Sequence, residues 1–139
     1  MDWKLCAVDD LRQYKQIKIG ILNSKERLRM INRTVKNSPY SPGSGQRRLD
    51  ATLINALVEG ERLGRNIASA EQIIKLTERG LGALDDEERK VLEKLYMANT
   101  PKTSSLIAKE LGYEVRTLYR LRDRALQKFT LAMYGAEIS

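Results

Sequence analysis

Two long stretches of the chain carry hydrophobic positions at alternating steps of three and four residues. In residues 3–37 the stripe consists of Tyr14, Ile17, Ile21, Ser24, Leu28, Ile31 and Val35. In residues 48–79 it consists of Leu49, Leu53, Ala56, Gly60, Leu63, Ile67, Ala70, Ile74 and Thr77. Such heptad spacing is typical of helices that pack along a narrow seam. The pattern therefore predicts two long helices.

The segment between these two helices is rich in residues that interrupt helices. It reads NSPYSPGSGQ from residue 37, which predicts a loop over residues 37–47. A short loop between two long helices predicts an antiparallel, coiled-coil-like hairpin. Each stripe is narrow, so a second copy of the chain could also supply a partner helix, and we expect a homodimer through these helices. Gly80 and Gly82 are expected to end the second helix in a left-handed conformation.

A third helix is predicted to begin at Asp85. Glu88 follows three residues later, and this spacing is typical of a capping box, in which each side chain accepts a hydrogen bond from the other residue's backbone N–H. The acidic run at residues 85–88 is therefore interpreted as a helix start, where negative charge is favoured, and not as a catalytic carboxylate pair. The apolar face of this helix consists of Val91, Leu92, Leu95 and Tyr96, and Asn99, Thr100 and Pro101 are expected to stop it.

Residues 104–121 read SSLIAKELGYEVRTLYRL, the pattern of a helix-turn-helix. Ile107 and Leu111 would face inward on a first helix, and Gly112 would form the turn. A second helix is predicted over residues 114–133, with a buried stripe formed by Val115, Leu118 and Leu121. A helix-turn-helix inserts its second helix into the major groove of DNA, so the sequence predicts a duplex-DNA-binding protein.

The outward-facing residues of this second helix are the candidate DNA contacts. Base reading is predicted for Arg116, Thr117, Tyr119 and Arg120, because arginine can pair with guanine through two hydrogen bonds and the other two can contact a thymine methyl or a phosphate. Contact with the DNA backbone is predicted for Lys102, Lys109, Arg122, Arg124 and Lys128. Arg122 and Arg124 have an alternative interpretation, in which they pair with Asp123 or Glu110 on the protein surface.

The fold class expected from these patterns is all-α with two domains. Residues 1–80 would form the helical hairpin and oligomerisation region, and residues 81–139 the helix-turn-helix DNA-binding domain. The net charge of +7 favours an anionic partner. Residues 1–48 hold 11 basic and 4 acidic side chains, so the first helix either has a solvated basic face or makes a second contact with phosphates.

Several protein classes are excluded by what the sequence lacks. It has no histidine and one cysteine, which excludes histidine-based acid–base chemistry, an internal disulfide and a zinc knuckle. We therefore expect no enzymatic activity, no metal and no cofactor. No apolar run reaches the roughly 18 residues that a membrane span needs, and the first residues, MDWKLCAVDD, do not read as a signal peptide. The expected location is the cytoplasm, without membrane contact.

Residues 84–129 resemble region 4 of the sigma-70 family of transcription factors. The matching residues are Glu88, Arg89, Leu92, Leu95, Ile107, Ala108, Leu111, Gly112, Leu118, Leu121, Arg124, Ala125 and Leu126. The rest of the chain, including Tyr40-Ser41-Pro42, is similar to small sigma-like regulators of phages and prophages, and ArpU-like and RinA-like late-gene activators share this layout. The resemblance implies a transcription activator at phage promoters that contacts host bacterial RNA polymerase.

One departure from the sigma family concerns promoter opening. A full sigma factor has an aromatic-rich second region that captures flipped bases, whereas Trp3, Tyr14 and Tyr40 are not clustered in this sequence. Promoter opening by this chain alone is therefore not expected.

The alternative function is that of a small terminase subunit in phage DNA packaging. Those proteins combine the same two kinds of helical region but usually place the DNA-binding domain first.

Overall fold

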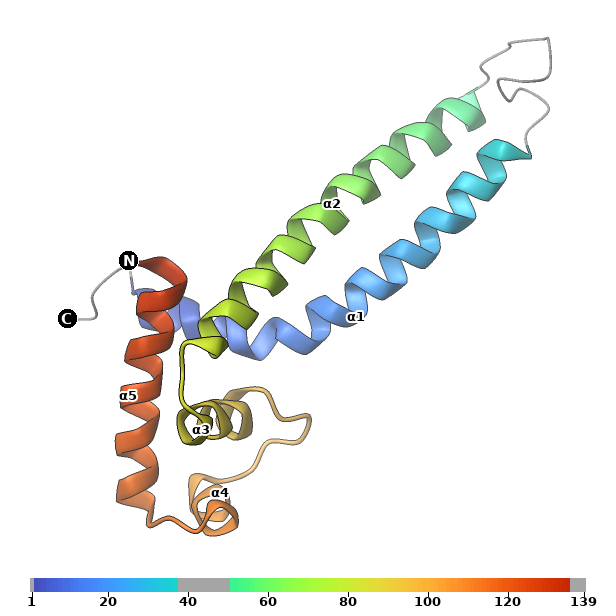
Figure 1. Ribbon diagram of the computed structural model, residues 1–139. Coiled ribbons are helices and arrows are strands. Elements are labelled where there is room, and N and C mark those ends of the chain that lie inside the picture. The colour runs from blue at the N-terminus through green and yellow to red at the C-terminus, as the bar shows by residue number, and fades with distance from the viewer. Residues whose placement is uncertain (1, 38–50, 136–139) are drawn as a thin grey trace. The chain divides into compact units, whose positions relative to one another are not determined.

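The computed structural model describes residues 2–37 and 51–135, and its regular structure is entirely helical. The helices are α1 (Trp3–Lys36), α2 (Ala51–Gly82), α3 (Asp86–Tyr96), α4 (Ser104–Leu111) and α5 (Val115–Tyr134), shown in Figure 1. The described residues contain no strand, so the predicted all-α fold class is confirmed. The predicted loop over residues 37–47 lies outside the described residues except for Asn37, as does Leu49 of the second stripe.

The contacts divide the chain into two units, and α1 and α2 each contribute to both. Unit 1 contains the described residues up to 16 and from 73 onward, and unit 2 contains those between 17 and 72. The predicted boundary at residue 80 therefore falls inside unit 1. The start of α1 belongs to unit 1 because the Trp3 ring lies 4.9 Å from the Tyr134 ring and the Tyr134 hydroxyl donates a hydrogen bond to Asp10.

Unit 2 consists of the facing parts of α1 and α2, which lie side by side in Figure 1. Gly60 of α2 faces α1 closely, since a Cβ at this glycine would lie 3.4 Å from Cγ2 of Ile31 and 3.6 Å from Cδ1 of Leu28. Every described position of the two predicted stripes is buried or partly buried, which confirms the faces that the heptad spacing predicted. In unit 2, only stripe residues of α2 are less than one-tenth exposed among the described positions, namely Leu53, Leu63 and Ile67.

Unit 1 has two adjoining hydrophobic clusters, and α5 contributes to both. The first consists of Ala7, Leu11, Leu81, Leu84, Leu92, Ala125, Leu126 and Phe129. The second consists of Val91, Ile107, Ala108, Leu118 and Leu121. The first half of α5 thus packs on α4 and α3, while its second half packs on α3 and on the ends of α1 and α2. This arrangement fixes which side of α5 is left exposed.

The ends of two helices differ from the predicted ones. α2 continues through Gly82, and neither Gly80 nor Gly82 has a positive φ, so the prediction that they end the helix in a left-handed conformation is wrong. Gly80 instead permits close packing, since a Cβ there would lie 2.8 Å from Cε1 of Phe129. α3 ends at Tyr96, before the predicted stop at Asn99.

Candidate nucleic-acid interface

The segment that joins α4 to α5 is held by backbone hydrogen bonds around one glycine. Gly112 has φ 78° and ψ 26°, a left-handed conformation that costs little without a Cβ. Its N–H donates to the carbonyls of Ala108 and Lys109, and the N–H of Tyr113 donates to Ala108 at 2.8 Å. At the other end of α4, the Thr103 hydroxyl accepts from the N–H of Leu106 at 3.2 Å. Both ends of α4 are therefore fixed, and the turn sets the direction in which α5 begins.

One side of the first half of α5 is buried against α3 and α4. Leu118 is fully buried and Leu121 is 7% exposed, in a cluster with Ile107 of α4 and Val91 of α3. Val115 packs on the same cluster. The inward stripe predicted from three-residue spacing is confirmed. Because a helix that buries one side presents the other, the remaining side chains in these turns face solvent.

The predicted base-reading residues lie mainly on this solvent-facing side. Arg116, Tyr119 and Arg120 are exposed, whereas Thr117 is partly buried. Arg116 and Arg120 are four residues apart, so they are neighbours on the helix surface. Neither has a carboxylate partner among the described residues. The structure thus brings two unpaired guanidinium groups together on α5.

Most of the predicted backbone contacts, in contrast, already have a partner within the protein. Lys102 pairs with Glu110 at 2.7 Å, and Arg122 pairs with Asp123 at 2.9 Å while stacking over the Tyr119 ring at 4.7 Å. Both Arg124 and Lys128 bind Glu88, and Lys109 alone among the five is exposed without an ion pair in the part of the chain that the structure describes.

Glu88 is the centre of a polar cluster that joins the start of α3 to α5. Its side chain is fully buried and accepts from Arg124 Nε at 3.1 Å, from Lys128 Nζ at 3.0 Å and from the N–H of Asp85 at 3.1 Å. Burial acts to raise the pKa of this carboxyl, but the hydrogen bonds from Asp85, Lys128 and Arg124 outweigh it and hold the pKa below its usual value. Glu88 is therefore ionised and fixes the orientation of α5 on α3.

Sequence reasoning identified the capping role of Glu88 but missed its partners on α5. The capping box is confirmed, since Glu88 N–H also donates to Asp85 Oδ1 at 2.8 Å. The partners lie 36 and 40 residues away in sequence, and no local pattern connects them. The only signal was that an acid in a core-facing position of α3 needs a cation nearby.

The starts of α3 and α5 differ in a way that bears on anion binding. α3 has the capping box and three acids in its first turn, namely Asp86, Glu87 and Glu88. α5 has no acid in its first turn, and its N-cap residue, Glu114, makes no side-chain capping bond. Within the described part of the chain, the first N–H groups of α5 therefore have no capping side chain, and Arg116 lies beside them. A helix start with free N–H donors and a nearby arginine favours an anion such as phosphate.

The described residues show neither a metal site nor a membrane-spanning helix. They contain no group of three or more acidic or cysteine side chains placed to hold a metal ion. None of the described helices has the length and apolar character needed to cross a bilayer. Comparison of the chain with protein-family models, with curated proteins and with solved structures finds no significant match.

Proposed function

We propose that this protein is a sequence-specific DNA-binding regulator of transcription that acts through a helix-turn-helix formed by α4, the Gly112 turn and α5. In this proposal α5 enters the major groove of duplex DNA. The observation that carries the proposal is the pair of exposed arginines, Arg116 and Arg120, without a carboxylate partner among the described residues, on a helix whose opposite side is buried.

The two arginines have a physical reason to bind an external group. Like charges four residues apart on a helix repel each other, and a cation near a helix start opposes the helix dipole. Hydrogen-bond acceptors from a ligand would relieve both effects. The O6 and N7 atoms of guanine accept two parallel hydrogen bonds from arginine, with a discrimination of about 1–3 kcal/mol for each pair. Arg120 and Arg116 are therefore assigned to base reading, with Thr117 and Tyr119 beside them.

The residues proposed to contact the DNA backbone are ranked by how strongly each is already paired within the protein. Lys109 is exposed and has no ion pair among the described residues, so it is the first candidate. Lys102 and Arg122 make ion pairs on the surface, and such pairs are weak enough to be exchanged for phosphates. Arg124 and Lys128 neutralise the buried Glu88, so their first role is to hold α5 in place.

The test compares two pairs of arginines. Selection from a random DNA pool with the full chain would give the preferred site. Arg116→Ala/Arg120→Ala is expected to lose at least about tenfold of the preference for that site over an unrelated duplex, as one lost bidentate contact would produce. The control, Arg62→Ala/Arg65→Ala, removes the same charge from exposed positions of α2 and is expected to retain the preference. Equal preference in both double variants would contradict the proposal.

The proposal extends to a homodimer through α1 and α2. In unit 2 the α1 stripe residues, such as Ile17, Ile21 and Leu28, are only partly buried, since a two-helix layer does not exclude water from both sides of its seam. A second copy would supply the missing layer. Sedimentation of the full chain should then give twice the mass of one chain. A ring of many copies would instead favour the packaging function of a small terminase subunit.

Activation of phage or prophage promoters together with host RNA polymerase is the further part of the proposal, and it depends on the resemblance to sigma region 4. Co-purification of the chain with bacterial RNA polymerase on a selected DNA site would test it. Binding to DNA without recruitment of the polymerase would leave a DNA-binding protein that regulates by another route.

A further inference from the structure

Basic side chains of α1 within unit 2 gather on one side of the helix. Five of them follow one another at steps of seven, four, four and three residues, which are all spacings that keep residues on one helix face. They are Lys18, Lys25, Arg29, Arg33 and Lys36. With a rise of about 1.5 Å per residue, the group extends over about 27 Å. These five residues are called the basic face of α1 below.

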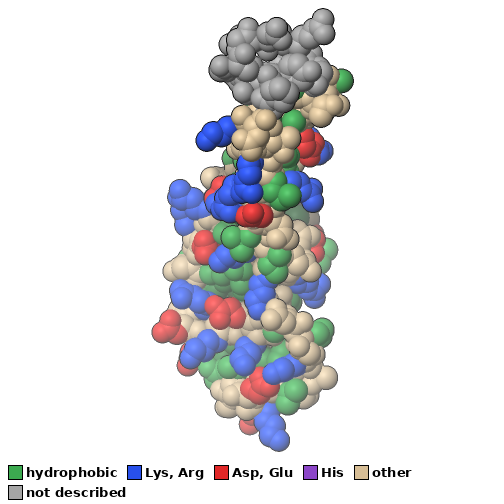
Figure 2. Space-filling model, turned by 90° about the vertical axis from the view of Figure 1, so that its right-hand side faces the viewer, with side chains coloured by type: hydrophobic (Ala, Val, Ile, Leu, Met, Phe, Trp, Pro, Cys, Tyr) green, Lys and Arg blue, Asp and Glu red, His purple; other side chains and the backbone are tan. Residues whose placement is uncertain are grey.

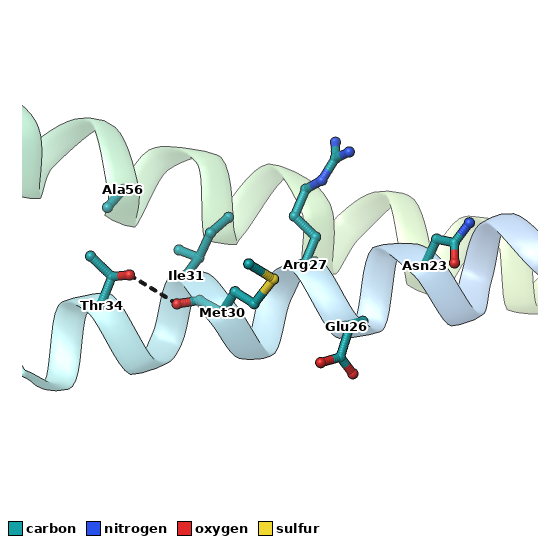
Figure 3. Close-up of a pocket in the computed structure, with 7 residues that line it drawn as sticks. All are labelled: Asn23, Glu26, Arg27, Met30, Ile31, Thr34 and Ala56. Carbon is teal, nitrogen blue, oxygen red and sulfur yellow. Dashed lines mark hydrogen bonds between the residues drawn. The ribbon is translucent and has the colours of Figure 1, made fainter.

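The opposite side of α1 has a different character. There Asn23, Arg27, Met30, Ile31 and Thr34, together with Glu26 and with Ala56 of α2, line an open groove of about 560 Å³ (Figure 3). Its polar groups are partly used within α1, since the Thr34 hydroxyl donates to the carbonyl of Met30 at 3.0 Å. Arg27 is the one basic side chain that lines this groove. Five of the six basic side chains that α1 has within unit 2 thus lie on one side of the helix.

The basic face is exposed and only partly neutralised. Lys25 pairs with Glu71 at 3.3 Å and Arg29 with Glu26 at 2.6 Å, yet their side chains remain 42% and 66% exposed. Arg33 and Lys36 are exposed and have no carboxylate partner among the described residues. Lys and Arg side chains also lie along the part of the molecule next to the grey atoms in Figure 2. Exposed ion pairs contribute little, so Lys25 and Arg29 can exchange their carboxylates for another anion.

We infer that the basic face of α1 binds the phosphate backbone of duplex DNA, independently of the bases. Its cations lie about 7 Å apart on average, within the screening length of about 8 Å at physiological salt, so their fields add. A row of positive charge along one helix face suits a long polyanion, and duplex DNA carries one negative charge per about 1.7 Å of its axis. The inference takes only the ligand, duplex DNA, from the proposed function and does not require base reading by α5.

The test measures how DNA affinity depends on salt. The probe is a 30-base-pair duplex of arbitrary sequence, and the protein is the full chain. Arg29→Gln/Arg33→Gln/Lys36→Gln removes three cations of the basic face. It is expected to weaken binding at least about tenfold at low salt and to reduce the slope of log affinity against log salt by about 2–3, since each phosphate contact contributes about 0.9. The control, Arg27→Gln/Arg62→Gln/Arg65→Gln, removes equal charge from elsewhere in unit 2 and should keep the wild-type slope.

The outcomes separate this inference from the proposed function. An unchanged salt slope in the basic-face variant, with its helical content intact by circular dichroism, would overturn the inference. Binding of an acidic polypeptide that depends on the basic face, with DNA binding unaffected, would overturn it in favour of a protein partner. Loss of sequence preference in Arg116→Ala/Arg120→Ala with the salt-dependent affinity retained would support it. A wild-type chain that binds all duplexes equally would contradict base reading by α5 while leaving this inference standing.

Discussion

Units 1 and 2 share the two long helices, and unit 1 also contains α3, α4 and α5. The two units bury their side chains to very different degrees. The largest side chains that are less than 2% exposed, including Phe129, Leu11 and Leu92, all belong to unit 1. In unit 2 the most buried side chains are Leu53, Leu63 and Ile67, at 6–7% exposure. Large hydrophobic side chains such as Leu22 and Val58 are 68% and 59% exposed there.

The difference shows that a heptad stripe alone does not make a core. In unit 1 Ala7 and Leu11 of α1 and Leu81 of α2 lie in one cluster with residues of α3 and α5, so the buried residues are covered from several sides. In unit 2 the stripes of α1 and α2 face only each other. Since local stability follows the density of buried apolar contacts, unit 2 should open more readily than unit 1 in a single chain. The proposed second copy and the proposed DNA contact would both act on this less stable unit.

The largest expected effect comes from removing a core aromatic from unit 1. Phe129→Ala deletes a fully buried ring and should lower the free energy of unfolding by about 3–5 kcal/mol. Leu63→Ala, in unit 2, should cost no more than about 2 kcal/mol, because water and neighbouring side chains can reach the space that is left. Denaturant titration of both variants, with hydrogen exchange to follow each unit, measures the difference.

Equal losses for these two substitutions would break the comparison between the units. A large loss for Leu63→Ala that depends on protein concentration has a specific meaning. It would indicate that a second chain covers Leu63 in solution, since dimerisation links stability to concentration. Dilution series of the wild type and of Leu63→Ala separate that case from a well-packed monomer.

The next effect concerns the ion cluster that holds α5 in unit 1. Glu88→Gln keeps the shape of the side chain but leaves Arg124 and Lys128 without their carboxylate. Removing one partner of a fully buried pair costs about 3–5 kcal/mol, and the half-exposed cations here reduce the expected loss to about 2 kcal/mol. Because α5 would lose its anchor on α3, sequence-specific DNA binding should weaken as well. Gel-shift and denaturant titrations measure the two effects.

The same carboxyl gives a pH dependence with a defined sign. Its pKa is lowered in the folded state, so the folded protein binds the proton less well than the unfolded chain does. The stabilisation by Glu88 is therefore fully present at a pH above the pKa of the unfolded chain, about 4.3. It is lost as the pH falls through the lower pKa of the folded protein. Wild type should lose more stability than Glu88→Gln between about pH 6 and about pH 3. If the stability of wild type and of Glu88→Gln changed with pH in the same way, Glu88 would not be the source of this pH dependence.

The sequence was informative about faces and helix starts, and less so about contacts between distant segments. Spacing alone predicted the buried stripe of α5 and the cap at Asp85, because both depend on residues within one or two turns. The binding of Arg124 to Glu88 could not be predicted, since it depends on how α5 crosses α3. For this reason the sequence assigned Arg124 to the DNA backbone, whereas the structure gives that side chain a partner inside the protein.

Two glycines show the same limit of prediction from local sequence. Gly112 was expected to form a turn and does so with a positive φ. Gly80 was expected to end a helix for the same reason, yet it lies inside α2 against Phe129. Local sequence does not distinguish a glycine needed for its backbone from one needed for its lack of a side chain. That distinction depends on which other helix approaches.

The smallest expected effects come from two glycines of α2 and have opposite signs. A Cβ at Gly80 would lie 2.8 Å from Cε1 of Phe129 and 3.1 Å from Cγ of Met133, whereas at Gly64, in unit 2, it would meet nothing within 4 Å. Alanine is better than glycine in a helix by about 0.8–1 kcal/mol. Gly64→Ala should therefore stabilise by up to about 1 kcal/mol. Gly80→Ala should destabilise by about 1 kcal/mol, because overpacking a core costs about 1–3 kcal/mol and outweighs the helix propensity.

Both substitutions are made in the same helix. If they change the free energy of unfolding in opposite directions, the cause is therefore the different packing of the two units. Midpoints of chemical denaturation at one protein concentration would measure it. If Gly80→Ala were as stabilising as Gly64→Ala, the Phe129 ring would have to move freely, and unit 1 would be packed no more tightly than unit 2. A destabilising Gly64→Ala would point the other way. It would mean that another chain packs closely on α2 at that glycine.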